Sequence, residues 1–139
     1  MEKKHTTLSF ALYVSTAALA FIGLVVYVIC SAVMTYYSDC SAVIITASVC
    51  AVAIIVALAV LSKKGTAPTW ITVLLIPVSC LLVFAMVSII GDRIDSFAWL
   101  VMSDLERMNI DGYRALYTSI GAVCCYVLAL IVNSVNAFK

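Results

Sequence analysis

The sequence predicts an all-α membrane protein with four transmembrane helices, because its charges are few and lie far apart. Of the 139 residues, 65% are hydrophobic and only 11% are charged. A soluble domain carries about 25% charged residues spread along its length, so that class is excluded, together with disordered chains and fibrous repeats. No Lys, Arg, Asp, Glu or His occurs in residues 6–38, 40–62, 65–91 and 115–138. Each of these windows exceeds the roughly 20 residues that a helix needs to cross a bilayer core.

The spans are helices rather than strands, because the windows are continuously apolar and much longer than a transmembrane strand. Helices also satisfy their own backbone hydrogen bonds in lipid. We expect the helices near residues 8–35, 42–62, 69–90 and 113–136. Two of the three connections are short, which favours an up-down four-helix bundle, with residues 1–139 as a single integral membrane domain.

Residues at the window edges support the helix boundaries in turn. Tyr36 is an aromatic anchor at the outer end of the first helix. Asp39 occupies the position of an N-cap for the second helix. Pro68 suits the first turn of the third helix, and Gly91 suits its C-terminal end. Asp111 is the expected N-cap of the fourth helix.

Basic residues predict the orientation, since Lys and Arg are retained on the cytoplasmic side of membranes. One side of the four-span arrangement carries five lysines, namely Lys3, Lys4, Lys63, Lys64 and Lys139. The other side carries three arginines, namely Arg93, Arg107 and Arg114. We therefore expect both termini in the cytoplasm and the protein in a plasma or inner membrane.

Residues 92–114 form the one long connecting segment, on the extracytoplasmic side, and they include an amphipathic pattern. A helix over 93–108 would place one apolar stripe on a single face, formed by Ile94, Phe97, Ala98, Val101, Leu105 and Met108. We expect this helix to lie flat at the outer surface. One interpretation is a connector anchored in the interface by Trp99.

The alternative interpretation is a docking surface for a partner. Trp99, Leu100 and Met102 fall outside the apolar stripe, where a helix lying flat has no need of them. With Glu106 and Arg107 they are the candidate docking residues. A calcium site is disfavoured, because the spacing of the acids matches no calcium loop.

The spans contain no ionisable anchor of the kind that proton-coupled pumps and drug exporters use. The six cysteines include no C-x-x-C pair, and Cys124 and Cys125 are adjacent and deep within the fourth window. They are therefore interpreted as packing residues rather than redox centres. The single histidine, His5, has no cluster of zinc ligands around it, so we expect no metal and no cofactor.

Small residues on the second helix, Ala47, Ala51, Ala53 and Ala57, favour close helix packing. They indicate either contacts within the bundle, which we favour, or a dimer face. Pro77 falls inside the expected third helix, where it would remove one hydrogen bond and could act as a hinge.

No catalytic constellation is recognisable, so the sequence favours a protein that is not an enzyme. The leading hypothesis is an accessory, assembly or regulatory subunit that contacts another membrane protein, or itself, within the lipid bilayer. An oligomeric transporter or channel for a neutral permeant is the first alternative, and a membrane thiol-disulfide enzyme is the second. Nucleic acid is excluded, since each basic cluster holds only two lysines.

Overall fold

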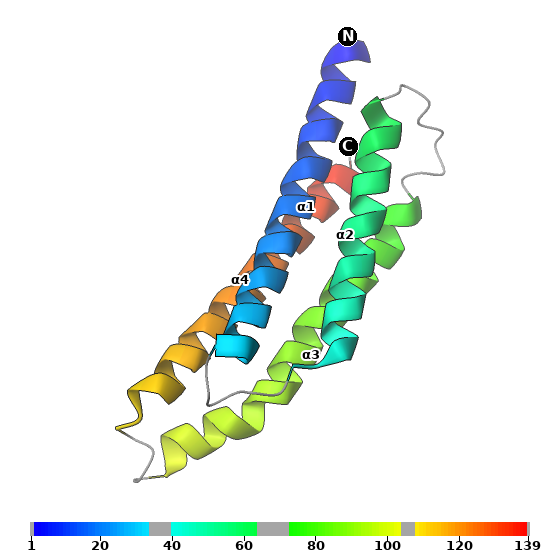
Figure 1. The fold of residues 1–139 in the computed structure, drawn as a ribbon. Helices are drawn as coiled ribbons and strands as arrows, with labels where there is room; N and C mark the ends of the chain where they lie inside the picture. Colours follow the sequence, from blue (N-terminus) through cyan, green and yellow to red (C-terminus); the bar gives the residue numbers. More distant parts are fainter. Residues whose placement is uncertain (1, 34–39, 64–72, 104–107, 139) are drawn as a thin grey trace.

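The computed structural model describes residues 2–33, 40–63, 73–103 and 108–138, with the backbone alone at 2–7 and 33. Four helices make up this part of the chain: α1 (Glu2–Val33), α2 (Ala42–Lys63), α3 (Leu75–Met102) and α4 (Ile110–Ala137) (Figure 1). Each helix contains a stretch that is long and apolar enough to span a membrane, and no strand occurs in the described ranges. The predicted all-α fold class with four spans is confirmed.

The helices form an up-down bundle in which each packs mainly against two others. Contacts connect α1 with α2, α2 with α3, α3 with α4 and α4 with α1, and the α1–α4 interface is the most extensive. Gly23 explains this close approach of α1 and α4. A Cβ atom added at Gly23 would lie 3.2 Å from Cε2 of Tyr126 and 3.3 Å from Cβ of Cys125. A side chain at position 23 would force the Tyr126 ring or the helix to shift by a few tenths of an ångström, so glycine suits this close packing against α1.

Each helix buries one stripe and exposes the remaining apolar surface to its surroundings. The α3 stripe repeats every three or four residues and consists of Leu75, Val78, Leu82, Ala85 and Ile89. Large apolar side chains such as Val56, Phe84 and Ile131 are about half exposed on the outside of the bundle. This arrangement suits a lipid environment, in which outward-facing apolar surface carries no penalty.

Polar side chains inside the bundle fix the helices relative to one another. Ser48 on α2 and Tyr126 on α4 share a hydrogen bond of 2.7 Å between their hydroxyl groups. The Asn133 side-chain amide on α4 donates to Oγ of Ser79 at 2.8 Å and to the carbonyl of Leu75 at 3.3 Å, both on α3. Such bonds between transmembrane helices are worth about 0.6 kcal/mol on average, so they specify register more than they supply stability.

The third helix differs from the prediction, because it does not end near residue 90. Gly91 and Asp92 are helical, and the segment expected to form a separate amphipathic helix from residue 93 instead continues α3 to Met102. Residues 104–107 of that segment lie outside the described residues. A single glycine costs a helix only about 1 kcal/mol, so Gly91 does not terminate it. Arg93, which bonds to α1, keeps the next turn attached to the bundle.

Two further helix starts differ from expectation. The α4 N-cap is Asn109, whose side-chain oxygen accepts a hydrogen bond of 3.1 Å from the Gly112 backbone N–H, whereas Asp111 lies within the first turn. Since α3 begins at Leu75, Pro77 occupies its first turn, where a missing N–H breaks no helical bond. The expected caps Asp39 and Pro68 lie outside the described residues.

Candidate functional site

All four helices lie together over a section of the bundle whose length is close to the thickness of a bilayer core. At its inner end Asn133 bonds to the Leu75 carbonyl, and at its outer end Arg93 bonds to Ser31. From Leu75 to Arg93 the helix rises through 18 residue steps, which extend about 27 Å along its axis. The hydrocarbon core of a bilayer is about 30 Å thick. We therefore take these two levels as the inner and outer edges of the core.

Arg93 connects α3 to α1 at the outer end of this section. Its side chain is buried, at 7% exposed, and it reaches from α3 across to α1. Its Nη2 donates to Oγ of Ser31 at 3.0 Å, and its guanidinium carbon lies 5.9 Å from the centre of the Tyr27 ring. The Tyr27 hydroxyl in turn accepts a hydrogen bond of 3.0 Å from the Ser41 backbone N–H, just before α2. Three helices are thus tied together at the outer edge of the core.

Beyond Arg93, α3 and α4 extend past the ends of α1 and α2 (Figure 1). We call this extension the outer tip and define it as residues 94–103 and 108–114. From Arg93 to Met102 the helix rises about 13 Å. With the level of Arg93 taken as the edge of the bilayer core, the outer tip lies beyond that edge.

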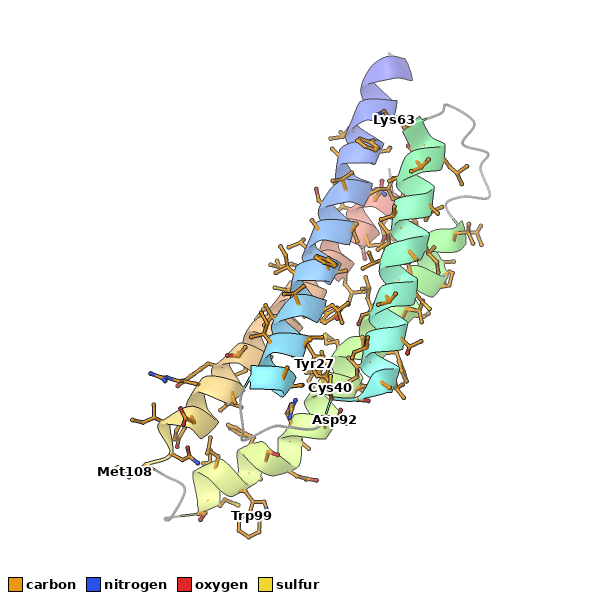
Figure 2. All side chains as sticks on the ribbon, in the orientation of Figure 1. Tyr27, Cys40, Lys63, Asp92, Trp99 and Met108 are labelled. Atoms are coloured by element: carbon orange, nitrogen blue, oxygen red, sulfur yellow. The ribbon has the colours of Figure 1, made fainter. Side chains whose placement is uncertain are left out.

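Large apolar side chains are exposed on the outer tip. Trp99 is 70% exposed, Met102 86%, Met108 89% and Ile110 68%. Figure 2 shows Trp99 and Met108 at this end of the molecule, away from the other helices. Ala98, Trp99, Met102 and Ser103 line a shallow hollow of about 340 Å³. Large apolar side chains are therefore exposed at this end of the molecule as well as along the sides of the bundle.

The five predicted docking residues do not all lie on the exposed surface that the structure describes. Trp99 and Met102 belong to the exposed outer tip. Leu100 is fully buried, so its assignment to a docking surface is wrong: it lies seven residues after Arg93, on the inward face of α3. Glu106 and Arg107 lie outside the described residues.

The apolar stripe of the outer segment forms the wall of a groove. Ile94 and Phe97 on α3 face Ile120 and Cys124 on α4 across a groove of about 290 Å³. Its lining is mostly apolar, with Arg93 and Ser119 as the polar members, and Ile94 remains 58% exposed. Ile94 and Phe97 thus belong to α3 itself and not to a separate helix lying flat.

The cysteines are all free thiols. Cys30 is buried, and its Sγ lies 3.4 Å from both Oγ of Ser119 and the Ala115 carbonyl oxygen. Cys50, Cys80 and Cys124 are exposed on the outside of the bundle. No group of three or more His, Cys, Asp or Glu that could hold a metal ion occurs among the residues the structure describes.

The small residues of α2 divide between two faces. Ala47 and Ala51 are buried within the bundle, as the favoured interpretation expects. Ala53 and Ala57 are exposed on the opposite side of the helix. Pro77, in the first turn of α3, does not interrupt the helix as the hinge hypothesis assumed.

Arg93 is the structural residue that the sequence reasoning missed. By sequence alone, Arg93 falls among the charges of the outer segment, because a charged residue there ends the apolar window. The missed signal was periodicity: Arg93 follows Ile89 by four residues and continues the buried stripe of α3.

Comparisons with family models, curated proteins and solved structures were made for the whole chain, and nothing matches it.

Proposed function

We propose that this small integral membrane protein is a non-enzymatic accessory, assembly or regulatory subunit, and that its outer tip docks a partner protein. The observation that carries the proposal is the exposure of Trp99 and Met102, at 70% and 86%, on the part of α3 that continues about 9–13 Å past Arg93. Tryptophan and methionine are enriched at protein interfaces.

The charges beside these residues indicate the chemistry of the partner. Asp92 and Asp95 are exposed on α3, and Asp111 is exposed at the start of α4, where it lies 3.8 Å from Arg114. A surface ion pair of this kind contributes little binding energy. An apolar patch with acids beside it suits an extracytoplasmic segment of a membrane protein that presents apolar side chains flanked by Lys or Arg.

Removing the two exposed side chains should abolish partner binding and leave the bundle intact. We expect the double variant Trp99→Ser/Met102→Ser to lose at least tenfold in co-purification from native membranes, because each buried anchor of an interface contributes on the order of 1–2 kcal/mol. The measurement is affinity purification in mild detergent with mass analysis of the retained proteins.

Phe138→Ser provides the matched control, since Phe138 is 93% exposed at the opposite end of the bundle. This variant should retain the partner in full. Unchanged co-purification of the double variant at normal expression would overturn the proposal, and so would equal loss in the Phe138 control.

We further propose that both termini are cytoplasmic and that the outer tip is extracytoplasmic. The support is the lysine excess beside the inner end of the bundle. In a Cys40→Ala background, which removes a thiol exposed near the outer end, Trp99→Cys should react with a membrane-impermeant maleimide in intact cells. Lys63→Cys should react only after permeabilisation. Labelling of Lys63→Cys in intact cells would reverse the topology.

A further inference from the structure

Two asparagines of α4 are buried at the inner end of the bundle. Asn133 is 1% exposed and Asn136 is 7% exposed, so both side-chain amides lie inside the protein. A buried amide has to form hydrogen bonds, because giving up its bonds to water without replacement costs free energy. The bonds that these two amides form within the described part of the chain therefore show whether the protein alone satisfies them.

Each of the two amides has one polar atom that the described residues leave without a hydrogen bond. Nδ2 of Asn133 donates to Oγ of Ser79 and to the Leu75 carbonyl, but Oδ1 of Asn133 accepts no bond from these residues. The Tyr13 side chain on α1 lies beside Asn136, yet no acceptor in the described ranges reaches hydrogen-bond geometry with Nδ2 of Asn136. One acceptor and one donor thus remain inside the bundle.

The spacing of the two asparagines on α4 suits one small molecule placed between them. Residues three positions apart on a helix share a face, and their Cβ atoms are about 5–6 Å apart. Two hydrogen bonds of about 2.9 Å that meet at one atom cover the same distance. The bridging molecule has to donate to Oδ1 of Asn133 and accept from Nδ2 of Asn136, so a simple anion or cation does not fit both atoms.

We propose that an ordered water molecule binds between Asn133 and Asn136 and completes their hydrogen bonds where α4 meets α3. Water both donates and accepts, and buried waters typically bond to polar groups that the protein leaves unsatisfied. Asn133 lies at the level that corresponds to the inner edge of the bilayer core, and Asn136 lies about 4.5 Å farther toward the inner end. Water therefore reaches the site without crossing the core. The site lies at the opposite end of the bundle from the outer tip, so it does not depend on the proposed docking function.

The test is nuclear magnetic resonance of the full-length protein in deuterated micelles, with nitrogen-15 introduced only into asparagine side chains. The chain contains three asparagines, so only three side-chain amides are observed. Cross-relaxation between the water resonance and the Asn136 amide protons should have the sign of a water molecule that tumbles with the protein. Absence of this signal, the sign of a short-lived surface water, or cross-relaxation with detergent in its place would refute the site.

Three variants show whether the signal comes from a water molecule held by both amides. Asn133→Leu removes the acceptor and should abolish the signal at Asn136. Ser134→Ala is the matched control, because the Ser134 hydroxyl is exposed and bonds to the Leu130 carbonyl of its own helix at 2.8 Å. Tyr13→Phe removes the neighbouring hydroxyl, whose exchange with water can also transfer magnetisation. The last two variants should keep the full signal.

Loss of the signal in Ser134→Ala or Tyr13→Phe would overturn the proposal, and so would its persistence in a folded Asn133→Leu variant. Thermal denaturation shows whether each variant is folded. The wild-type spectrum decides the question even where Asn133→Leu fails to fold, since the bound water has to appear there.

Discussion

Gly23→Leu is expected to separate α1 from α4 and to destabilise the protein by about 3 kcal/mol or more. The Cβ of the new side chain alone would lie 3.2 Å from the Tyr126 ring and 3.3 Å from Cβ of Cys125, and the remaining carbons of leucine would be added at a buried position. Relief requires a shift of α1 along the most extensive interface of the bundle. The measurement is the free energy of unfolding, or the thermal midpoint, in detergent micelles.

Gly121→Leu is the matched control, because a Cβ added at Gly121 would meet nothing within 4 Å. Replacing a helical glycine by leucine at an open position should be neutral or stabilising by up to about 1 kcal/mol. Equal stability of the Gly23 and Gly121 variants would show that α1 and α4 do not pack through this glycine.

Tyr126→Ala is the second substitution with a large expected effect. The Tyr126 side chain is fully buried, its ring lies against Gly23, and its hydroxyl bonds to Ser48. Removing the ring leaves a cavity, so we expect a loss of about 3–5 kcal/mol. Tyr126→Phe keeps the ring and removes only the hydrogen bond, so about 0.6 kcal/mol should be lost.

A Ser48→Ala variant checks the division between ring packing and hydrogen bonding. It should cost about as much as Tyr126→Phe, and combining the two should add little, because both remove the same bond. If Tyr126→Phe proved as destabilising as Tyr126→Ala, the hydrogen bond and not the ring would hold α4 in place, contrary to this description.

The sequence predicted the four spans because membrane insertion depends on composition over about 20 residues, which needs no knowledge of tertiary contacts. The end of α3 was mispredicted for the opposite reason. Gly91, Asp92 and Arg93 resemble a helix end locally, but the hydrogen bond from Arg93 to Ser31 stabilises the continuing helix through a contact with α1. A contact between residues 62 positions apart cannot be derived from the local pattern.

The sequence predicts the exposure of two candidate docking residues correctly and that of a third incorrectly. Trp99 and Met102 were selected because they fall outside the apolar stripe, and both are exposed. Leu100 was selected on the same argument but is fully buried, because the inward face of α3 continues beyond Arg93. A separate helix beginning at residue 93 could turn Leu100 outward. In the continuous α3, Leu100 lies on the same buried face as Leu82 and Ile89.

Contact of the outer tip with a partner protein is best detected by photocrosslinking from single positions on α3. A photoreactive amino acid would replace Trp99 in one variant and Phe84, half exposed at the middle of α3, in another. After irradiation of native membranes, position 99 should give one discrete adduct of higher mass that contains a second protein, while position 84 should give only lipid adducts. No protein adduct at position 99, or the same adducts at both positions, would contradict the claim.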